Sequence, residues 1–272
     1  MGMLQLLLRT YERIDKRFDP YKLKLSIIEN NLYGVDIQPM AVEISRLRAW
    51  LSVIVEEQDK TKVHALPNLD FKFISANSLV NLKNEETIFA KPGLEEDMAN
   101  LREKYFNARL PERKQKIQSE YYELTACYSF DQRDERTEQL QSFDPFKNRT
   151  SASFFDSRIM FGIQDGFDAV IGNPPYIHFE KMDKADREFH KELGYETYAA
   201  RGDIYTLFYE RGIQLLKEKG ILTFITSNKW LRAQYGKNLR NFFLKKSNPL
   251  LLIDLGAGRF TSATVDTNIL LT

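Results

Sequence analysis

The chain has 272 residues, 43% hydrophobic and 28% charged, with a formal net charge of +1 at pH 7. These values are ordinary for a soluble globular protein with a full core in one large domain or two, and they do not by themselves indicate nucleic-acid binding. No apolar run approaches the roughly 20 residues of a membrane span, residues 1–6 lack the basic flank of a signal peptide, and the single cysteine, Cys127, excludes an intrachain disulfide. We therefore expect a cytoplasmic protein with no membrane partner.

The first third of the chain predicts alternating helices and strands. Apolar spacing predicts a helix over about residues 4–18, and residues 31–36 are typical of a strand that ends on Asp36. Pro39 suits the first turn of a second helix that runs to about residue 57. The expected apolar side of that helix carries Ile44, Leu47, Leu51 and Ile54. Residues 68–75 alternate apolar and polar side chains and predict a strand that ends at Asn77 and Ser78.

The middle of the chain, from about residue 80 to 165, differs in character. Residues 95–109 and 111–140 are highly charged and rich in helix formers, and a loop is expected near residues 143–150. We interpret this part as a charged helical insertion whose charges form a solvated face. The alternative is a DNA-contacting role, although mixed signs make a poor track for phosphates.

The last part of the chain returns to alternating elements. We expect strands at residues 167–170, 220–226, 250–254 and 267–271, with helices at about residues 203–217 and 235–246. Strands that alternate with helices predict an α/β fold with a doubly wound, mainly parallel sheet. We find no internal repeat.

The strand at residues 167–170 leads into Ile171-Gly172-Asn173-Pro174-Pro175-Tyr176, and we call residues 173–176 the diproline loop. Prolines cannot continue a strand, and Asn173 is restricted to an extended conformation because it precedes a proline. The loop therefore lies at the carboxyl end of a strand, where open α/β sheets place their ligands. The Asn173 side-chain carbonyl and the Pro174 backbone carbonyl are two acceptors that suit a planar NH2 group, and Tyr176 offers a flat face for its ring. The simpler reading is a proline-rich turn.

Asn-Pro-Pro-Tyr after a strand resembles the catalytic motif of amino-methyltransferases, of which DNA adenine methyltransferases are the largest group. Residues 32–44 are similar to the methylase part of bacterial type II restriction–modification enzymes that carry methylase and nuclease on one chain. The resemblance implies a Rossmann-like class I methyltransferase core, S-adenosylmethionine as cofactor and double-stranded DNA as partner. It also implies that a flipped-out adenine is held by Asn173, Pro174, Pro175 and Tyr176.

The same resemblance assigns cofactor-binding residues. Asp36 would hold the ribose and Ile37 would pack on the cofactor adenine, which the motif at Asn77 and Ser78 would read. The wider family often has aspartate where Asn77 stands, so that role is open, and Asp36 alone could equally be an acid favoured by a helix dipole. The remaining residues expected to line the cofactor pocket are Asn173, Asp203, Tyr205 and Phe208.

Several basic residues are candidate DNA contacts, and ordinary surface charge is the alternative for each of them. They are His178, Lys229, Arg232, Lys237, Arg240, Lys245 and Lys246. The three histidines, His64, His178 and His190, do not form a ligand set, so we expect no metal.

Residues 252–258 resemble a glycine-rich cofactor loop, but the expected helix and acid-ended strand do not follow, so we interpret them as a late strand and its loop. The true loop should precede the Asp36 strand, and nothing before Tyr33 contains it. We therefore expect a fragment, with a core incomplete at its N-terminal strand and without a target-recognition domain. Its parts would be residues 1–80 (cofactor half), 81–165 (insertion) and 166–272 (catalytic loop and target-base half).

Such a fragment would leave unpaired strand edges and exposed apolar surface. We expect weak or absent cofactor binding, no activity alone, association with the remainder of the parent polypeptide, and a homodimer or swapped dimer. The alternatives to a DNA methyltransferase are a protein-glutamine or ribosomal-RNA amino-methyltransferase, which share the loop, or a non-catalytic DNA-binding scaffold.

Overall fold

The computed structural model describes residues 2–14, 19–56, 68–83, 93–108, 110–128, 135–147, 150–256 and 266–272. The chain forms two compact units, Met1–Gly162 and Ile163–Thr272. Within the described residues no helix is both long and apolar enough to cross a membrane.

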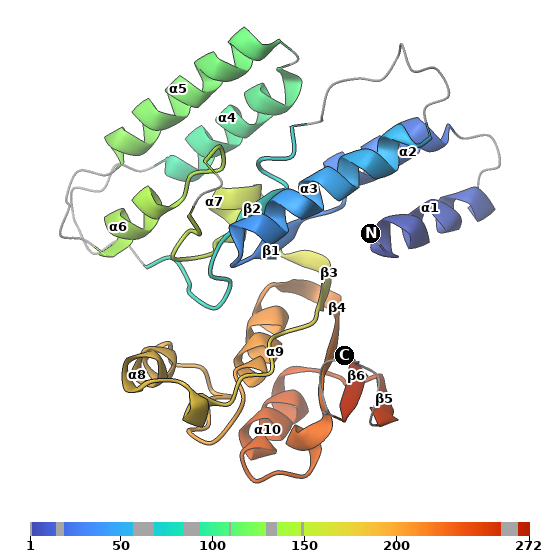
Figure 1. Ribbon diagram of the computed structural model, residues 1–272, viewed down its shortest axis with the longest axis vertical. Helices are drawn as coiled ribbons and strands as arrows, with labels where there is room; N and C mark the ends of the chain where they lie inside the picture. Colours follow the sequence, from blue (N-terminus) through green and yellow to red (C-terminus); the bar gives the residue numbers. More distant parts are fainter. Residues whose placement is uncertain are drawn as a thin grey trace. The chain divides into compact units, whose positions relative to one another are not determined.

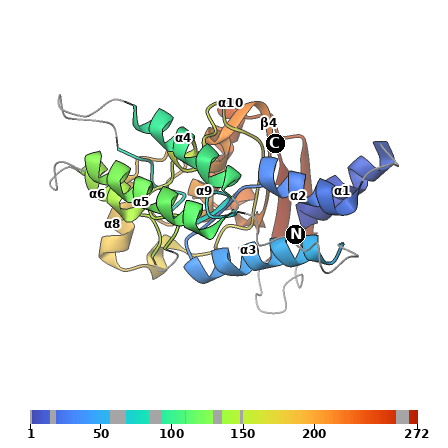
Figure 2. The same cartoon turned by 90° about the horizontal axis from the view of Figure 1, so that it is seen from above.

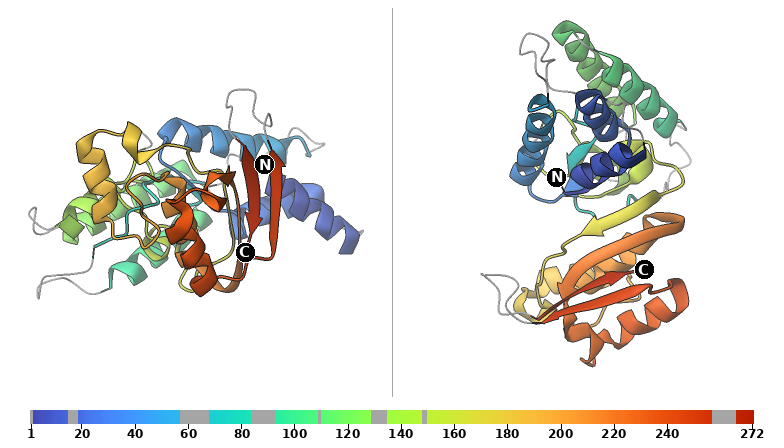
Figure 3. Two further views of the ribbon diagram at one scale, coloured as in Figure 1. Left: turned by 90° about the horizontal axis from the view of Figure 1, so that it is seen from below. Right: turned by 90° about the vertical axis from the view of Figure 1, so that its right-hand side faces the viewer.

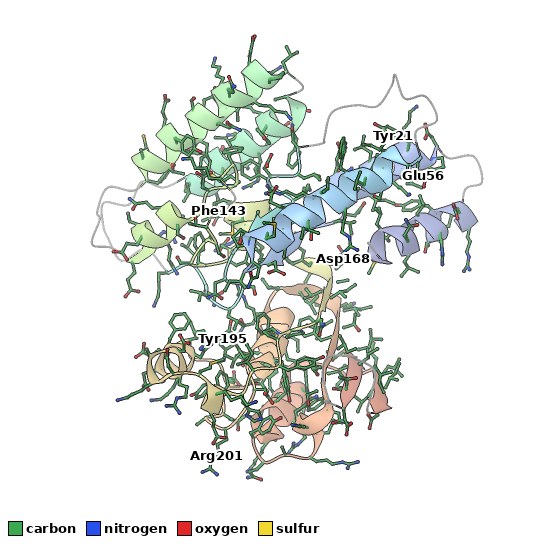
Figure 4. The ribbon with its side chains drawn as sticks, viewed as in Figure 1. Tyr21, Glu56, Phe143, Asp168, Tyr195 and Arg201 are labelled. Atoms are coloured by element: carbon green, nitrogen blue, oxygen red, sulfur yellow. The ribbon has the colours of Figure 1, made fainter. Side chains whose placement is uncertain are left out.

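The first unit is built on a short parallel pair of strands, β1 (Gly34–Asp36) and β2 (Phe73–Ser75). Helices α1 (Gly2–Ile14), α2 (Pro20–Asn30) and α3 (Pro39–Ile54) pack around a common apolar core (Figure 1). Where α2 and α3 meet, the buried Lys24 ammonium contacts the carboxylate of Glu56, which Figure 4 labels. Helix α2 was not predicted, although its start carries a local signal: Asp19 caps it and Pro20 occupies its first turn.

The expected apolar side of α3 was wrong. Ile44, Leu47 and Leu51 are about half exposed, at 48%, 50% and 46%. The residues that α3 buries are Val42, Arg46, Ala49 and Val53. Arg46 faces inward because its guanidinium donates to the backbone carbonyls of Asp70 and Phe73 and pairs with the Asp70 carboxylate. A buried, fully bonded arginine cannot be recognised from apolar spacing.

The charged middle of the chain folds into α4 (Leu94–Asn107), α5 (Pro111–Cys127), α6 (Glu135–Ser142) and the short α7 (Ser157–Phe161). Helices α4 and α5 lie side by side (Figures 1 and 2). They are not solvated on all sides, because Tyr105 of α4 and Tyr121 of α5 are buried. The Asn68 amide, from the segment before β2, donates to the carbonyls of Tyr105 and Ala108, so these helices pack within the first unit.

The second unit contains a four-stranded sheet in the order β3-β4-β6-β5. Its strands are β3 (Phe167–Gly172), β4 (Leu216–Ser227), β5 (Leu251–Gly256) and β6 (Thr267–Leu271). Helices α9 (Tyr205–Gln214) and α10 (Gly236–Lys246) cover one face of it (Figure 3). The core between them contains Tyr209, Leu222, Phe224, Leu239 and Phe243. At the start of β3, Asp168 (Figure 4) pairs with Lys217 of β4.

The predicted α/β class is confirmed, with corrections to pairing and boundaries. The described strands form two sheets, and only β1/β2 and β3/β4 are parallel, whereas β6 is antiparallel to both β4 and β5. The β5–β6 connection, residues 257–266, is shorter than the dozen or more residues that a parallel crossover requires. The helix expected at residues 203–217 ends at Gln214, because Leu216 already belongs to β4. Helix α8 (Lys184–Glu192) was not predicted, and it buries none of its side chains.

The face of the second sheet opposite α9 and α10 is apolar and exposed. Ile171, Ile221, Leu251 and Ile253 are 54%, 42%, 51% and 40% exposed. Strand register places Ile171 beside Thr223, Thr223 beside Leu271, and Leu271 beside Leu251. These side chains therefore share one surface, which we call the open sheet face.

Candidate active site

The diproline loop begins where β3 ends. Gly172 pairs with Phe224 of the parallel strand β4, so the loop lies at the carboxyl edge of both strands. A Cβ at position 172 would lie 2.9 Å from the Phe224 ring, which explains the glycine. Pro174 is buried, whereas Asn173 and Pro175 are exposed. The loop thus buries one proline and presents Asn173 at the surface.

Hydrogen bonds within the described residues do not saturate the two expected acceptors. Asn173 Oδ1 lies 3.2 Å from the Tyr176 hydroxyl, which also lies 3.2 Å from the backbone oxygen of Ile225. One hydroxyl hydrogen cannot fully satisfy both oxygens, and an amide oxygen has two lone pairs, so Asn173 Oδ1 retains capacity for another donor. Among the hydrogen bonds of the described residues, none ends on the Pro174 carbonyl.

The Tyr176 ring is held in a fixed orientation. Its hydroxyl is tied to β4 through Ile225, and its ring meets the Tyr205 ring edge-on, with centroids 6.1 Å apart and planes at 84°. Burial raises the pKa of Tyr176, so its hydroxyl stays protonated and donates at neutral pH.

A second set of contacts lies directly behind the loop. The Tyr205 and Tyr235 hydroxyls are 2.9 Å apart, and the Tyr235 hydroxyl donates to Asp203 Oδ2 at 3.0 Å. His178 Nε2 lies 3.6 Å from the same carboxylate oxygen. Burial is the main cause that raises the pKa of Tyr205 and Tyr235, so both hydroxyls stay protonated. We call His178, Asp203, Tyr205 and Tyr235 the Asp203 network.

The network changes the interpretation of three predicted site residues. Asp203 is 4% exposed and Tyr205 is fully buried, so both side chains are used inside the second unit. His178 is not an ordinary surface histidine, because its ring packs against the Tyr235 ring, with the two centroids 5.9 Å apart. The sequence predicted Tyr235 at the start of a helix and gave its hydroxyl no role. Its partners lie about 30 positions away, so no local pattern could have shown the contact.

The residues expected to hold the cofactor in the first unit lie at one edge of its parallel strands. Asp36 ends β1 beside Ser75 of β2, and its Oδ1 accepts from the Gln38 N–H at 2.8 Å. Asp36 is exposed and Ile37 is 56% exposed. One carboxylate oxygen remains for a vicinal diol and an apolar side chain stands beside it, so these residues fit a nucleoside.

Asn77 and Ser78 follow β2 at the same edge and are half-buried. The Asn77 side-chain oxygen already accepts from the Leu79 N–H at 3.2 Å. Asparagine therefore forms the same side-chain turn that aspartate would, and its amide NH2 is the group left to face a ligand.

The candidate DNA contacts divide into two kinds. Lys229, Arg232 and Lys237 are exposed, as are Lys245 and Lys246. Arg240 is half-buried, and its guanidinium donates to the carbonyls of Trp230 and Ala233, so it stabilises the turn before α10.

Phe208, which was expected to line the cofactor pocket, is half-buried against the core of the second unit.

No set of three His, Cys, Asp or Glu side chains in the described part of the chain could hold a metal ion. His64 and residues 257–265, which include most of the expected late loop, lie outside the described residues. The predicted late strand that precedes residue 257 is present as β5, Leu251–Gly256.

Comparison with known proteins places these residues in a family context. The family model described as Eco57I restriction-modification methylase matches residues 30–260. A Methanocaldococcus jannaschii protein named as a type II restriction enzyme and methyltransferase is 28% identical over 99% of this chain, which covers 28% of that protein. The type II restriction enzyme and methyltransferase RM.Eco57I of Escherichia coli is 34% identical over 34% of this chain and 9% of its own length.

More distant matches extend the comparison. The adenine-specific methyltransferase PglX of Lacticaseibacillus casei is 23% identical over 79% of this chain and 18% of its own length. A solved Listeria monocytogenes structure described as a class I S-adenosylmethionine-dependent methyltransferase gives a TM-score of 0.33 at 14% identity, over 87% of this chain and 68% of that one. The chain thus spans about a quarter of the length of the M. jannaschii relative.

Proposed function

Because the chain belongs to the Eco57I restriction-modification methylase family, we propose that it serves the methylation of the adenine exocyclic amine in DNA, within a restriction–modification system. Its relatives include proteins named as adenine-specific methyltransferases. S-adenosylmethionine is the methyl donor in this proposal. Two relatives are named as restriction enzyme and methyltransferase together, so an endonuclease activity is proposed only for the complete polypeptide.

The observation that carries the proposal is the pair of acceptors in the diproline loop. Asn173 Oδ1 and the Pro174 carbonyl each accept one hydrogen of the target amine. This draws the nitrogen lone pair out of conjugation with the ring and makes it nucleophilic. The loop is anchored to β4 through Tyr176 and Ile225, so its acceptors are oriented before the base arrives. Positioning and electrostatics then supply most of the rate gain.

The cofactor residues follow from the first unit. S-adenosylmethionine, when bound, supplies an electrophilic methyl group. Asp36 accepts hydrogen bonds from the ribose through its free carboxylate oxygen, Ile37 covers one adenine face, and Asn77 and Ser78 contact the adenine edge. In the second unit, the residues proposed for the cofactor are Asn173, Asp203, Tyr205 and Phe208; because Asp203 and Tyr205 are buried, they act there through packing rather than as a polar surface.

The target base must leave the duplex to reach the loop, which costs a few kcal/mol. Stacking on the Tyr176 ring returns about 1–3 kcal/mol. Lys229, Arg232 and Lys237 contact phosphates in a sequence-independent way, and that binding weakens as salt rises.

The experiment is a methyl-transfer assay with the native polypeptide that carries these residues, labelled S-adenosylmethionine and adenine-containing duplex DNA. After nucleoside digestion, we expect the label on the adenine amine. In parallel reactions with protein and with ribosomal RNA as substrates, label on a glutamine or on the RNA instead would identify one of the other amino-methyltransferase groups. DNA binding without any transfer would identify a non-catalytic scaffold.

A further inference from the structure

We propose that Tyr235 is a positioning residue for methyl transfer, because its hydroxyl sets the Tyr205 ring against which the target-stacking Tyr176 ring is held. The inference rests on the proposed function of the diproline loop. It assigns to the turn before α10 a role besides contact with DNA.

The contacts form a continuous path within the second unit. The Tyr176 ring meets the Tyr205 ring edge-on, and the Tyr205 hydroxyl lies 2.9 Å from that of Tyr235. Tyr235 then donates to Asp203 at 3.0 Å. Each link is a ring contact or a hydrogen bond between side chains that are buried or half-buried, so a change at Tyr235 is transmitted to the stacking ring.

The same hydroxyl fixes the chain that leaves the diproline loop. Backbone hydrogen bonds join Ile204 N–H to the Ile177 carbonyl and Phe179 N–H to the Gly202 carbonyl. Between them, His178 faces Asp203. His178 Nδ1 is buried and has no hydrogen-bond partner among the described residues, so the carboxylate side determines how the ring is oriented. Without the Tyr235 hydroxyl, the buried Asp203 carboxylate would lose a hydrogen bond. Tyr205 and His178 would then be held less firmly in their positions.

Tyr235 itself is held in place by its neighbour. A Cβ on Gly236 would lie 2.0 Å from the Trp230 carbonyl, so the start of α10 touches the backbone of the preceding turn (η3, Asn228–Leu231). That turn carries the exposed Lys229, and Arg232 follows it. A rigid link therefore joins candidate phosphate contacts to the tyrosine that stacks on the base.

The kinetic test uses Tyr235→Phe in the native polypeptide, which keeps the ring and removes the hydroxyl. Tyr198→Phe is the matched control, because Tyr198 packs its ring on Phe179 while its hydroxyl makes no hydrogen bond within the described structure. We expect kcat for DNA methylation to fall about tenfold in Tyr235→Phe with KM for DNA within twofold of wild type, and no change in the control. Tyr205→Phe breaks the same link from the other side and is expected to give the same loss, which covers the case in which Tyr235→Phe does not fold.

The second readout needs no turnover. The chain has three histidines, so their imidazole resonances can be separated by NMR in residues 1–272. Tyr235→Phe should shift the His178 signals and leave those of His190 in place.

The outcomes separate this inference from the proposed function. Unchanged kcat in both Tyr235→Phe and Tyr205→Phe would overturn the inference while leaving the function intact. A rise in KM at unchanged kcat would also overturn it, because Tyr235 would then bind DNA rather than position the loop. If the wild-type polypeptide does not methylate DNA, the function fails and the inference with it, even where the His178 signals shift.

Discussion

The Tyr176 ring and hydroxyl have separable roles, and substitution by phenylalanine and by alanine distinguishes them. The hydroxyl contributes contacts to the Ile225 carbonyl and Asn173 Oδ1, both at 3.2 Å. A neutral hydrogen bond of this kind is worth about 0.5–1.5 kcal/mol net. Its loss in Tyr176→Phe is partly offset, because Asn173 Oδ1 becomes fully available to the target amine.

The ring contributes more. Base–aromatic stacking is worth about 1–3 kcal/mol, and since 1.4 kcal/mol is a factor of ten, Tyr176→Ala should lower the population of extruded base by about 5- to 150-fold. Tyr176→Phe keeps the face that stacks and the edge contact with Tyr205. We therefore expect the phenylalanine variant to retain most base flipping and the alanine variant to lose it.

The assay is the fluorescence of 2-aminopurine placed at the target position of duplex DNA, which rises when the base leaves the stack. Titration with wild-type, Tyr176→Phe and Tyr176→Ala polypeptide gives the relative flipping equilibria directly. Equal losses in the two variants would refute stacking as the role of this side chain and would assign the effect to the hydroxyl.

Three further predictions concern the cofactor, the turn and the open sheet face. Asp36→Ala should weaken S-adenosylmethionine binding by about tenfold or more in calorimetry of the native polypeptide, since hydrogen bonds to a charged group are worth about 1.5–3 kcal/mol. An unchanged affinity would show that Asp36 does not bind the cofactor. Gly236→Ala should destabilise residues 1–272 by about 1–3 kcal/mol in thermal unfolding, because the added Cβ would lie 2.0 Å from the Trp230 carbonyl oxygen. The control is Gly2→Ala, because nothing lies within 4 Å of a Cβ at that position. Equal melting temperatures for the two variants would contradict a steric clash at position 236. Residues 1–272 should self-associate through the open sheet face in light scattering, and Ile171→Lys should shift them toward monomer; a wild-type monomer would contradict this.

Local chemistry explains what the sequence could reveal. The start of α3 at Pro39, the β3 strand and the loop that follows it were predictable, because proline removes a hydrogen-bond donor and fixes φ wherever it stands. The last strand, β6, was predicted with the bounds that the structure gives it.

Features that depend on distant partners were not predictable. Arg46 is buried because carbonyls of Asp70 and Phe73 lie within its reach, and this reversed the expected face of α3. His178 is turned inward because Asp203 lies opposite it across a backbone pairing. In both cases a polar side chain occupies the interior because its partners come from another segment, which periodicity does not encode.

The most direct test of the central claim is the effect of Asn173→Ala on methyl transfer to adenine in duplex DNA by the native polypeptide, measured with DNA affinity and thermal stability. Asn173 is exposed, so its truncation should leave folding and DNA binding near wild type. Loss of one preorganised partner of the reacting group should lower kcat by about 10²–10³, as for a missing oxyanion-hole donor. A variant that folds, binds DNA and methylates at the wild-type rate would show that the diproline loop does not hold the target amine.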